Sequence, residues 1–393
     1  MSSFISLNSW EEPGAILQAE SPAETVEGGP QDWERLSGLL ARHRRTGGDT
    51  RHPRSGAVGY ITYEGGFRFD WYPQIDVLRE NNSSAMWSRH KAAAQERAAA
   101  ATDTADWCSN QTQPEFEARV ARAQEYIAAG DIYQVNLAQR FATPFAGNSY
   151  ALFEHLLARS PAPGAALLDF GETQVLSASP EMFLRLRGRH ITTRPIKGTR
   201  PRSRDPMRDE QLAFELLTDP KELAELVMIT DLERNDLGRI CEYGSVAVTQ
   251  LVHLERFPHV FHLVSTVEGL LQPEIDAAAA VRSCLPGGSI SGAPKKRACE
   301  IIAELEPCPR GIYTGIIGYF ADNGDAAFSM AIRTMVRQGG ELSFYVGSGI
   351  TAGSVPAREY EETLHKAAGM RLALEAYEEA TRGNDRPAAV NRS

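Results

Sequence analysis

The clearest hydrophobic pattern in the chain is helical and covers residues 113–130. Apolar side chains recur there every three or four residues, at Phe116, Val120, Ala123 and Ile127. Pro114 near the start and Gly130 at the end are typical start and stop signals of a helix. The segment therefore predicts a helix that buries one face.

A capped helix is predicted over residues 219–238. Asp219 is a good N-cap residue, Pro220 suits the first helical position, and Gly238 closes the segment. A final helix is predicted to begin near Pro356 and to run to about residue 380.

Alternation of apolar and polar residues predicts strands through much of the remaining chain. In residues 131–143, Gln134 belongs to the polar face of such a strand. Residues 173–198 predict a hairpin that turns at residues 187–189. Further strands are predicted in five segments: 55–73, 244–257, 311–321, 326–338 and 341–351.

The strands come in consecutive runs with helices between the runs, which predicts a layered α+β fold and argues against regular βαβ winding. We expect residues 1–112 to form an N-terminal region that contributes strands to the layers. Its alanine-rich segment 85–107 would be helical or loosely ordered and would serve as a linker. Residues 113–380 would form the main domain, and residues 381–393 a disordered tail.

Composition narrows the class of protein. The chain has 393 residues, a formal net charge of −10 and a pI of about 5.5, which argues against nucleic-acid binding. It contains no run of about 18 apolar residues, so no membrane span is expected. The N-terminus lacks a signal-peptide pattern, and the five cysteines are scattered without metal-ligand spacing. We therefore expect a cytoplasmic protein.

Lys197 has an unusual setting in the stretch TTRPIKGTRP, residues 192–201. Burial and neighbouring cations both favour a neutral, nucleophilic amine, and three arginines lie close in sequence: Arg194, Arg200 and Arg202. The alternative is a surface lysine at a strand end, in a basic loop that attracts anions.

Three glutamates are candidate ligands of a metal ion. Glu225 shares a helix face with apolar residues, and Glu359 and Glu362 lie three apart on one face of the last helix. Carboxylates without nearby histidine or cysteine suit Mg2+. The alternative for the last two is a solvated face, with Glu362 paired to Lys366.

Other residues are ambiguous when taken singly. Glu181 follows Pro180 at a strand start, where it is either a general acid with a raised pKa or an ordinary edge-strand residue. His262 lies in an apolar strand and is either a core histidine or a ligand contact. Arg333 suits a carboxylate ligand.

The glycine-rich stretches are LPGGSISGAPKKRA and YVGSGITAG. They match neither a phosphate loop nor a dinucleotide-binding turn, and the alternative interpretation is that they are tight turns between strands.

The order of the motifs is more informative than any one of them. The sequence contains, in this order, GDIYQVNLAQRF, SASPEMF, RPIKGTRPR, ELVMITDLERNDLGR, HLVSTVEG, LPGGSISGAPKKRA, GIYTGIIGY, MAIRT, YVGSGIT and EYEETLHKA. Together they resemble the chorismate-utilising enzymes, which include anthranilate synthase component I, aminodeoxychorismate synthase component I, and the isochorismate and salicylate synthases. The resemblance covers roughly residues 113–375. It implies a layered α/β/β/α fold around a deep central cleft, with residues 113–380 as the chorismate-binding catalytic domain.

The resemblance also implies roles for individual residues. It makes Glu181 the general acid at C4 of chorismate and Glu225 and Glu362 the Mg2+ ligands, with Glu359 nearby. The implied substrate contacts are Gly198, Thr199, His262, Tyr313, Arg333, Gly347 and Gly349. Gln134 stands where isochorismate synthases carry a lysine base, so its presence disfavours attack by water.

Lys197 points to one branch of the family. The matching motif of anthranilate and isochorismate synthases resembles Pro-Ile-Ala-Gly-Thr, whereas a lysine is typical of aminodeoxychorismate synthase component I. The implied reaction converts chorismate and ammonia to 4-amino-4-deoxychorismate, for 4-aminobenzoate and folate synthesis, through a covalent adduct of Lys197. No cysteine lies in a Gly-x-Cys-x-Gly turn, so we expect the ammonia to come from a separate glutamine amidotransferase subunit.

Two alternatives remain open at the level of sequence. One is anthranilate synthase component I, and the other is a non-catalytic relative that acts as a binding or regulatory subunit. The segment ILQAES only loosely resembles the family element that forms part of a tryptophan pocket, so binding of tryptophan stays an open question.

Overall fold

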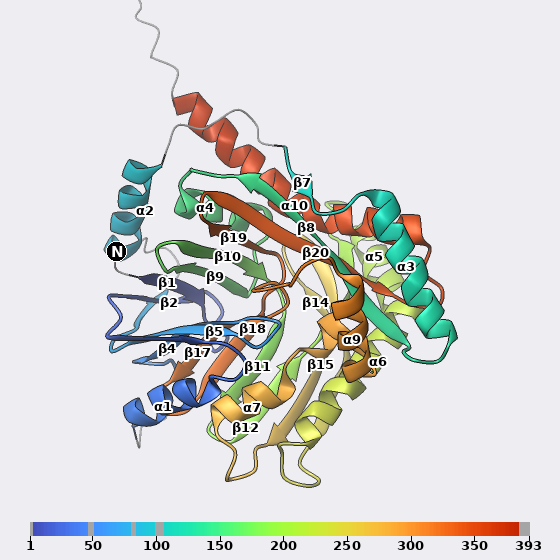
Figure 1. Cartoon of the computed structure of the whole chain (residues 1–393), viewed down its shortest axis with the longest axis horizontal. Helices are drawn as coiled ribbons and strands as arrows, with labels where there is room; N and C mark the ends of the chain where they lie inside the picture. Colours follow the sequence, from blue (N-terminus) through green and yellow to red (C-terminus); the bar gives the residue numbers. More distant parts are fainter. Residues whose placement is uncertain (1–2, 46–50, 80–83, 99–105, 385–393) are drawn as a thin grey trace, which may run out of the picture.

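Two ten-stranded sheets form the centre of the molecule in a computed structural model that describes residues 3–45, 51–79, 84–98 and 106–384 (Figure 1). Every strand pairing is antiparallel. The first sheet has the order β16 (Gly292–Ala293), β8 (Gln134–Pro144), β20 (Glu341–Ile350), β19 (Thr334–Gln338), β10 (Thr173–Ser179), β9 (Gly164–Asp169), β1 (Phe4–Asn8), β2 (Ala15–Glu20), β6 (Asp76–Arg79), with β7 (Cys108–Ser109) beside β8.

The second sheet contains the β11–β12 hairpin. Its order is β13 (Ile196–Pro201), β15 (Val260–Leu270), β12 (His190–Arg194), β11 (Met182–Arg187), β18 (Ala326–Met330), β17 (Ile316–Ala321), β4 (Gly56–Ile61), β5 (Phe67–Tyr72), β3 (Glu24–Gly28), with β14 (Ala247–Arg256) beside β15. The N-terminal strands extend both sheets, because β1 pairs with β9 and β4 pairs with β17.

Helices cover the outer faces of the two sheets. Their bounds are α1 (Trp33–His43), α2 (Ala85–Arg97), α3 (Gln113–Ala128), α4 (Ser149–Arg159), α5 (Pro206–Leu217), α6 (Pro220–Gly238), α7 (Ala277–Cys284), α8 (Gly288–Ser291), α9 (Lys295–Leu305) and α10 (Pro356–Asn384). In Figure 1, α4 and α10 lie over the first sheet and α1 and α7 beside the second.

Three apolar clusters hold these layers together, and each is buried by a different pair of layers. One cluster lies between the sheets and includes Ile5 of the first sheet and Ile317 of the second. Another joins Leu374 of α10 to the outer face of the first sheet, and a third joins Leu36 of α1 to the second. The layer order is therefore helix, sheet, sheet, helix, and the predicted layered fold is confirmed.

Local sequence signals placed several elements correctly. The helices α3 and α6 begin and end as their caps predict, and the Asp219 side chain accepts hydrogen bonds from the backbone N–H groups of Lys221 and Glu222. The β11–β12 hairpin turns at Gly188, which has φ +57°. The last helix reaches Asn384, and the rest of the predicted tail lies outside the described residues.

The prediction of one strand over residues 326–338 was wrong. The chain leaves the second sheet after Met330 and enters the first sheet at Thr334, with Arg333 at the crossing. The predicted strand over 311–321 also begins late, at Ile316. None of the described helices combines the length and apolar character that a membrane crossing requires.

Candidate active site

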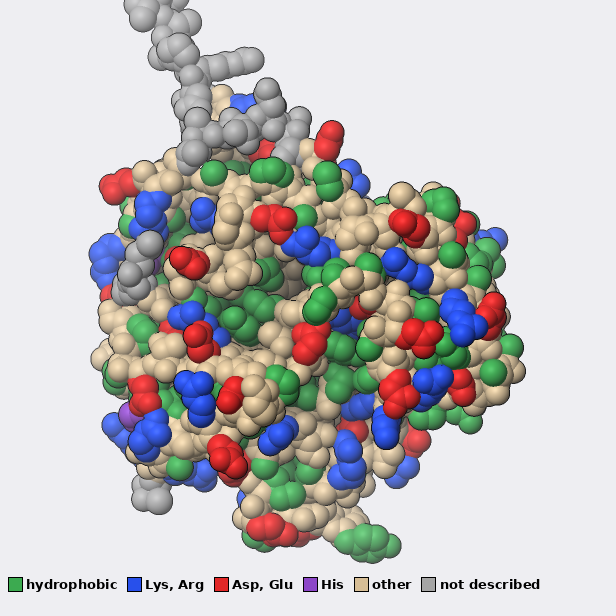
Figure 2. All heavy atoms as spheres, viewed as in Figure 1, with side chains coloured by type: hydrophobic (Ala, Val, Ile, Leu, Met, Phe, Trp, Pro, Cys, Tyr) green, Lys and Arg blue, Asp and Glu red, His purple; other side chains and the backbone are tan. Residues whose placement is uncertain are grey.

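A cavity of about 490 Å³ opens between the two sheets and the helices α6 and α10. All predicted site residues except Gln134 and Glu359 line it, which brings together side chains from widely separated motifs. The lining residues from the prediction are Glu181, Lys197, Gly198, Thr199, Glu225, His262, Tyr313, Arg333, Gly347, Gly349 and Glu362. On the face of the molecule shown in Figure 2, acidic and basic side chains are interspersed without a large patch of one sign.

Glu181 occupies the point where the chain crosses from one sheet to the other. β10 ends at Ser179 in the first sheet, and β11 begins at Met182 in the second. The Glu181 side chain is 4% exposed, and burial raises its pKa to about 7, although Ser289 and the Lys197 charge oppose the shift. A carboxyl group with this pKa carries a proton part of the time at neutral pH, which suits a general acid.

Lys197 enters the cavity from an irregular strand. The register of β13 on β15 shifts between Lys197 and Thr199, and Gly198 between them has φ +67°. A bulge of this kind turns consecutive residues toward one side, and residues 196–200 all line the cavity. The Lys197 Nζ donates a hydrogen bond of 3.2 Å to the carbonyl oxygen of Ser289.

The arginines near Lys197 do not have the role expected from their sequence positions. Each of them pairs with a carboxylate: Arg194 with Glu255, Arg200 with Asp219 and Arg202 with Asp209. Their charges are therefore compensated inside the protein, so they leave little positive field to act on Lys197 or to attract an anion. The expected effect of an uncompensated arginine cluster was wrong.

Arg333 differs from those arginines. It lines the cavity and forms no ion pair or side-chain hydrogen bond with any described residue. Burial lowers its pKa, which reflects the cost of keeping the guanidinium away from water. Its backbone has φ +51°, a left-handed conformation that is uncommon for a side chain of this size. A strained arginine without a counter-ion is well placed to receive an anionic ligand.

His262 lies opposite Thr199 on the neighbouring strand β15. Its Nδ1 lies 3.1 Å from the Thr199 Oγ1 and 3.3 Å from the carbonyl oxygen of Gly198. Burial lowers the pKa of His262, which favours the neutral imidazole. The ring is thus a cavity contact, tied to two other predicted substrate contacts.

Two tyrosines and the glycines of β20 form the opposite wall. Tyr313 stacks on Tyr345 with ring centroids 5.2 Å apart. A side chain at Gly347 would come within 2.9 Å of the Tyr313 hydroxyl, and one at Gly349 would collide with the Gln134 Nε2. Both glycines therefore keep the wall open, and Gln134 lies behind Gly349.

The acidic end of the cavity contains Glu225 and Glu362. The Nζ of Lys221 is 3.9 Å from Glu225 Oε1, and the Nζ of Lys366 is 2.7 Å from Glu362 Oε1, which is the pairing that the alternative interpretation of this helix predicted. Burial raises the pKa of Glu362, but the charge and hydrogen bond of Lys366 outweigh it and lower the pKa overall. Glu359 is buried beside them and accepts a hydrogen bond from the Ser348 hydroxyl.

These carboxylates supply the oxygen donor atoms that a hard divalent cation prefers. Among the described residues, no three histidine, cysteine, aspartate or glutamate side chains are already gathered closely enough to hold a metal ion. The donors are nonetheless all oxygen atoms, and Lys221 lies where its charge acts on both Glu225 and Glu362. Because Lys221 is 58% exposed, its ion pair with Glu225 is weak and can be exchanged for another cation.

Comparison with known proteins identifies the family. Residues 70–371 match the family described as chorismate binding enzyme. The chain belongs to this family. It is 48% identical over 278 residues to anthranilate synthase component 1 of Streptomyces coelicolor, covering 70% of this chain and 54% of that protein. It is 44% identical over 271 residues to aminodeoxychorismate synthase component 1 of Bacillus subtilis, and the match covers 69% of this chain and 58% of that protein.

A solved structure supports the same grouping. The chain resembles anthranilate synthase component I of Streptococcus pneumoniae at 30% identity with a TM-score of 0.73, covering 94% of this chain and 90% of that one. The chain spans a little over half the length of the curated relatives it matches.

Several lining residues of this chorismate binding enzyme escaped the sequence analysis. Glu222 lies one helical turn before Glu225, a spacing that could have indicated it, and repulsion from Glu225 adds to burial in raising its pKa. Asn136 and Ser289 carry no distinctive local signal. The Asn136 Oδ1 is buried without a hydrogen-bond partner among the described residues, so it is available to a ligand.

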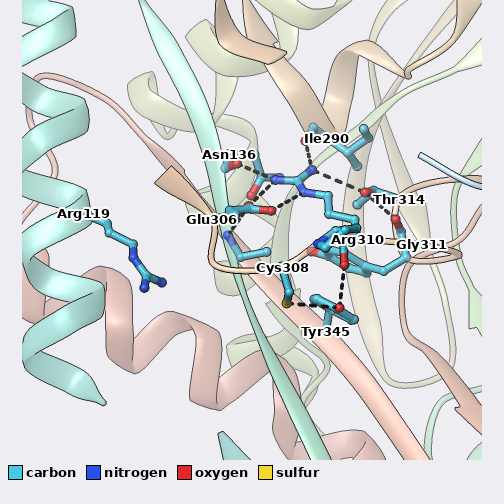
Figure 3. Close-up of polar contacts among 12 residues, drawn as sticks. Arg119, Asn136, Ile290, Glu306, Cys308, Arg310, Gly311, Thr314 and Tyr345 are labelled. Carbon is cyan, nitrogen blue, oxygen red and sulfur yellow. Dashed lines mark hydrogen bonds and ion pairs between the residues drawn. The ribbon is translucent and has the colours of Figure 1, made fainter. Parts of the chain in front are cut away.

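A buried ion pair that the sequence analysis also missed fixes the wall of the cavity (Figure 3). Arg310 Nη2 and Nε donate to the two carboxylate oxygens of Glu306 at 2.6 and 2.8 Å. The same guanidinium donates to the carbonyl oxygens of Asn136 at 2.7 Å and Ile290 at 3.0 Å. It thus joins β8 to the segment that carries Ser289, which positions two walls of the cavity.

Proposed function

We propose that this chain is a component I synthase that converts chorismate and ammonia to 4-amino-4-deoxychorismate. The observation that carries the proposal is the presence of both Lys197 and Glu181 in the wall of one cavity. An amine that forms no ion pair with any described residue and a carboxyl group with a pKa of about 7 are the two groups that nucleophilic displacement of a hydroxyl requires.

Arg333 and Tyr313 are proposed to bind the enolpyruvyl carboxylate. Arg333 can present two parallel N–H groups to a carboxylate, and burial raises the pKa of Tyr313 to about 12, so its hydroxyl stays a donor. His262, Thr199 and the backbone at Gly198 would contact the ring. Gly347 and Gly349 leave room for the substrate because a side chain at either position would collide with its neighbours.

The proposed reaction has two displacements. The neutral amine of Lys197 attacks C2 of the ring, the double bond shifts, and the C4 hydroxyl leaves as water with the proton of Glu181. Ammonia then adds at C4, the double bond shifts back, and the C2–N bond to Lys197 breaks. The covalent step directs nitrogen to C4. Gln134 supplies no base for water, consistent with an amine nucleophile.

Glu225 and Glu362 are proposed to hold Mg2+, with Glu359 behind them. When bound, the metal would neutralise and orient the ring carboxylate. A separate glutamine amidotransferase is the proposed source of ammonia.

Anthranilate synthase component I is the second candidate. It is supported by the names of most relatives, including those from Streptomyces coelicolor and Thermus thermophilus, the latter 49% identical over 259 residues. In that reaction nitrogen adds at C2, where an adduct with Lys197 would block it.

The deciding experiment identifies the product. The purified chain is incubated with chorismate, Mg2+ and ammonium at mildly alkaline pH, and products are resolved by chromatography and mass spectrometry. We expect 4-amino-4-deoxychorismate, and we expect Lys197→Ala to lower its formation by at least about 100-fold. Lys221→Ala, in the same cavity, is the control for loss of a positive charge. Anthranilate as the product of the wild-type chain would overturn the proposal.

A further inference from the structure

A second buried carboxyl group, Glu233, interacts electrostatically with Glu181 and has no part in the proposed chemistry. Glu233 is on α6, about two turns beyond Glu225, and its side chain is 7% exposed. It forms no ion pair with any described residue. A side chain at Gly288 would lie 3.3 Å from the Glu233 Cγ, so Glu233 packs directly against the residue that precedes Ser289.

The hydrogen bonds of Thr193 indicate the protonation state of Glu233. The Thr193 Oγ1 lies 2.7 Å from the carbonyl oxygen of Phe183 and 2.6 Å from Glu233 Oε2. A hydroxyl has one hydrogen, and a carbonyl oxygen can only accept. If Thr193 donates to Phe183, its contact with Glu233 is a hydrogen bond only when Glu233 carries the proton. Neutral Glu233 satisfies all three groups at once.

Among the charged groups near Glu233, Glu181 has the largest effect on its pKa. Asp236 is on the same helix but forms an ion pair with Lys295 of α9, and Lys295 also donates a 3.1 Å hydrogen bond to the carbonyl oxygen of Cys284 at the end of α7. This pair largely compensates itself. Burial and then the Glu181 charge raise the pKa of Glu233 to about 8.

We propose that Glu233 is a positioning residue that shares a proton with Glu181 as a coupled carboxyl pair, so that part of Glu181 stays protonated at alkaline pH. The inference rests on the proposed role of Glu181 as general acid. Two nearby buried carboxylates resist losing both protons, and the last proton is distributed over both groups. Glu181 alone would lose its proton in a single step.

The sharing also matters at the moment of proton transfer. When Glu181 gives its proton to the leaving hydroxyl, it becomes an anion in a buried site. A neutral Glu233 makes that anion less costly than an ionised Glu233 would. In this proposal, Glu233 sets the pH range over which Glu181 keeps a proton that it can donate.

Glu233→Gln tests the pair, because glutamine is neutral at every pH and can donate to Thr193 as the protonated acid does. Chorismate consumption is followed from pH 6 to 9, and each profile is normalised to its own value at pH 6. We expect the alkaline half-activity point to move down by about 0.5 to 1 pH unit. Glu233→Leu, which is neutral but cannot bond to Thr193, should move it equally. Superposable wild-type and Glu233→Gln profiles would overturn the inference, as would a shift in Glu233→Leu alone.

Infrared spectroscopy of the free protein provides a readout independent of the reaction. At pH 7.5 the wild-type chain should show absorption of protonated buried carboxyl groups, and Glu233→Gln should lose most of it. If this band is unchanged, Glu233 is ionised and the inference fails. If the wild-type chain consumes no chorismate but the band behaves as expected, the proposed function fails and the carboxyl pair stands.

Discussion

Two positive side chains in the cavity wall, Lys197 and Arg333, form no ion pair with any described residue. The other cations of the wall do so: Arg200 with Asp219, Lys221 with Glu225, and Lys366 with Glu362. A partly buried cation without a counter-ion is destabilising unless a ligand supplies the missing charge. Among the described residues the wall therefore contains one guanidinium and one amine without a counter-ion, which is consistent with the roles proposed for Arg333 and Lys197.

Arg333→Gln is predicted to weaken binding of chorismate by roughly 10- to 100-fold, because a hydrogen bond to a charged group contributes about 1.5–3 kcal/mol. Quenching of tryptophan fluorescence by chorismate in the presence of Mg2+ measures the dissociation constant. Arg200→Gln is the matched control, since this guanidinium lines the same cavity but is already paired with Asp219. Equal losses in the two variants would contradict the special role of Arg333.

Glu181→Gln is predicted to lower kcat by about 100- to 10,000-fold and to stabilise the protein at alkaline pH. The folded protein raises the pKa of Glu181 from 4.5 to about 7, so it binds the proton more tightly than the unfolded chain does. The free energy of unfolding contributed by this group therefore falls as pH rises from about 4.5 through 7. Removing the group should recover up to about 3 kcal/mol at pH 8.5 and much less at pH 5.

Urea unfolding at pH 5 and pH 8.5 measures this difference. A stability gain that is the same at both pH values would show that the substitution acts through packing and not through the proton of Glu181.

At the scale of elements, the site is built where the chain changes sheets. The crossing from β10 to β11 carries Glu181, and the crossing from β18 to β19 carries Arg333. The two crossings lie side by side, because the Met330 N–H donates to the Glu181 carbonyl and the Ala178 N–H donates to the Arg333 carbonyl. Backbone hydrogen bonds thus fix the acid and the guanidinium relative to each other.

Sequence could predict the elements that depend on local signals but not these crossings. The caps of α6 and the turn at Gly188 depend on residues that are neighbours in the sequence, so both could be predicted from the local sequence pattern. The segment 326–338 stays apolar and strand-like through Arg333, and only pairing with distant strands divides it between two sheets. The left-handed backbone of Arg333 has no signal in its own sequence.

Gly198→Ala is predicted to lower both stability and activity, because alanine at φ +67° costs about 1–2 kcal/mol and its Cβ would lie 2.8 Å from Leu216 Cδ1. Relaxation of the bulge would move Lys197, and kcat should fall by more than about tenfold. Gly188→Ala is the control, since Gly188 has φ +57° and no atom within 4 Å of its added Cβ. Urea unfolding should show that Gly188→Ala lowers the free energy of unfolding by a similar amount, while its kcat stays unchanged. A loss of kcat in Gly188→Ala as large as that in Gly198→Ala would contradict this prediction.

At the scale of the whole molecule, the site depends on long-range convergence that spacing cannot reveal. Glu225 lies on α6, which packs on the second sheet, and Glu362 lies on α10, which packs on the first. Their common cavity was expected only because the ordered motifs resemble a family. The ion pairs of the arginines near Lys197 and the electrostatic interaction of Glu233 with Glu181 depend on tertiary structure, for which the motifs give no rule.

This arrangement predicts that Mg2+ and chorismate stabilise the molecule cooperatively. Glu225 and Glu362, which would hold the cation, lie on helices that belong to different layers, so a bound cation would link these layers. Its charge would favour binding of one carboxylate of chorismate, and the other carboxylate would neutralise Arg333. Each ligand that binds only the folded state adds about 2.7 kcal/mol at one hundred times its dissociation constant. Thermal unfolding with both ligands should therefore show a larger rise in Tm than the sum of the separate rises.

Glu362→Gln should remove this cooperativity, because it deletes one of the two carboxylates proposed to hold the cation. Glu361→Gln is the matched control, since the neighbouring side chain is exposed on the same helix and carries the same charge. Calorimetric titration with Mg2+ should show at least about tenfold weaker binding in the first variant and no change in the second. If both variants keep the cooperative rise in Tm, the cation does not bridge the layers at Glu362, and the carboxylates there serve only to balance Lys221 and Lys366.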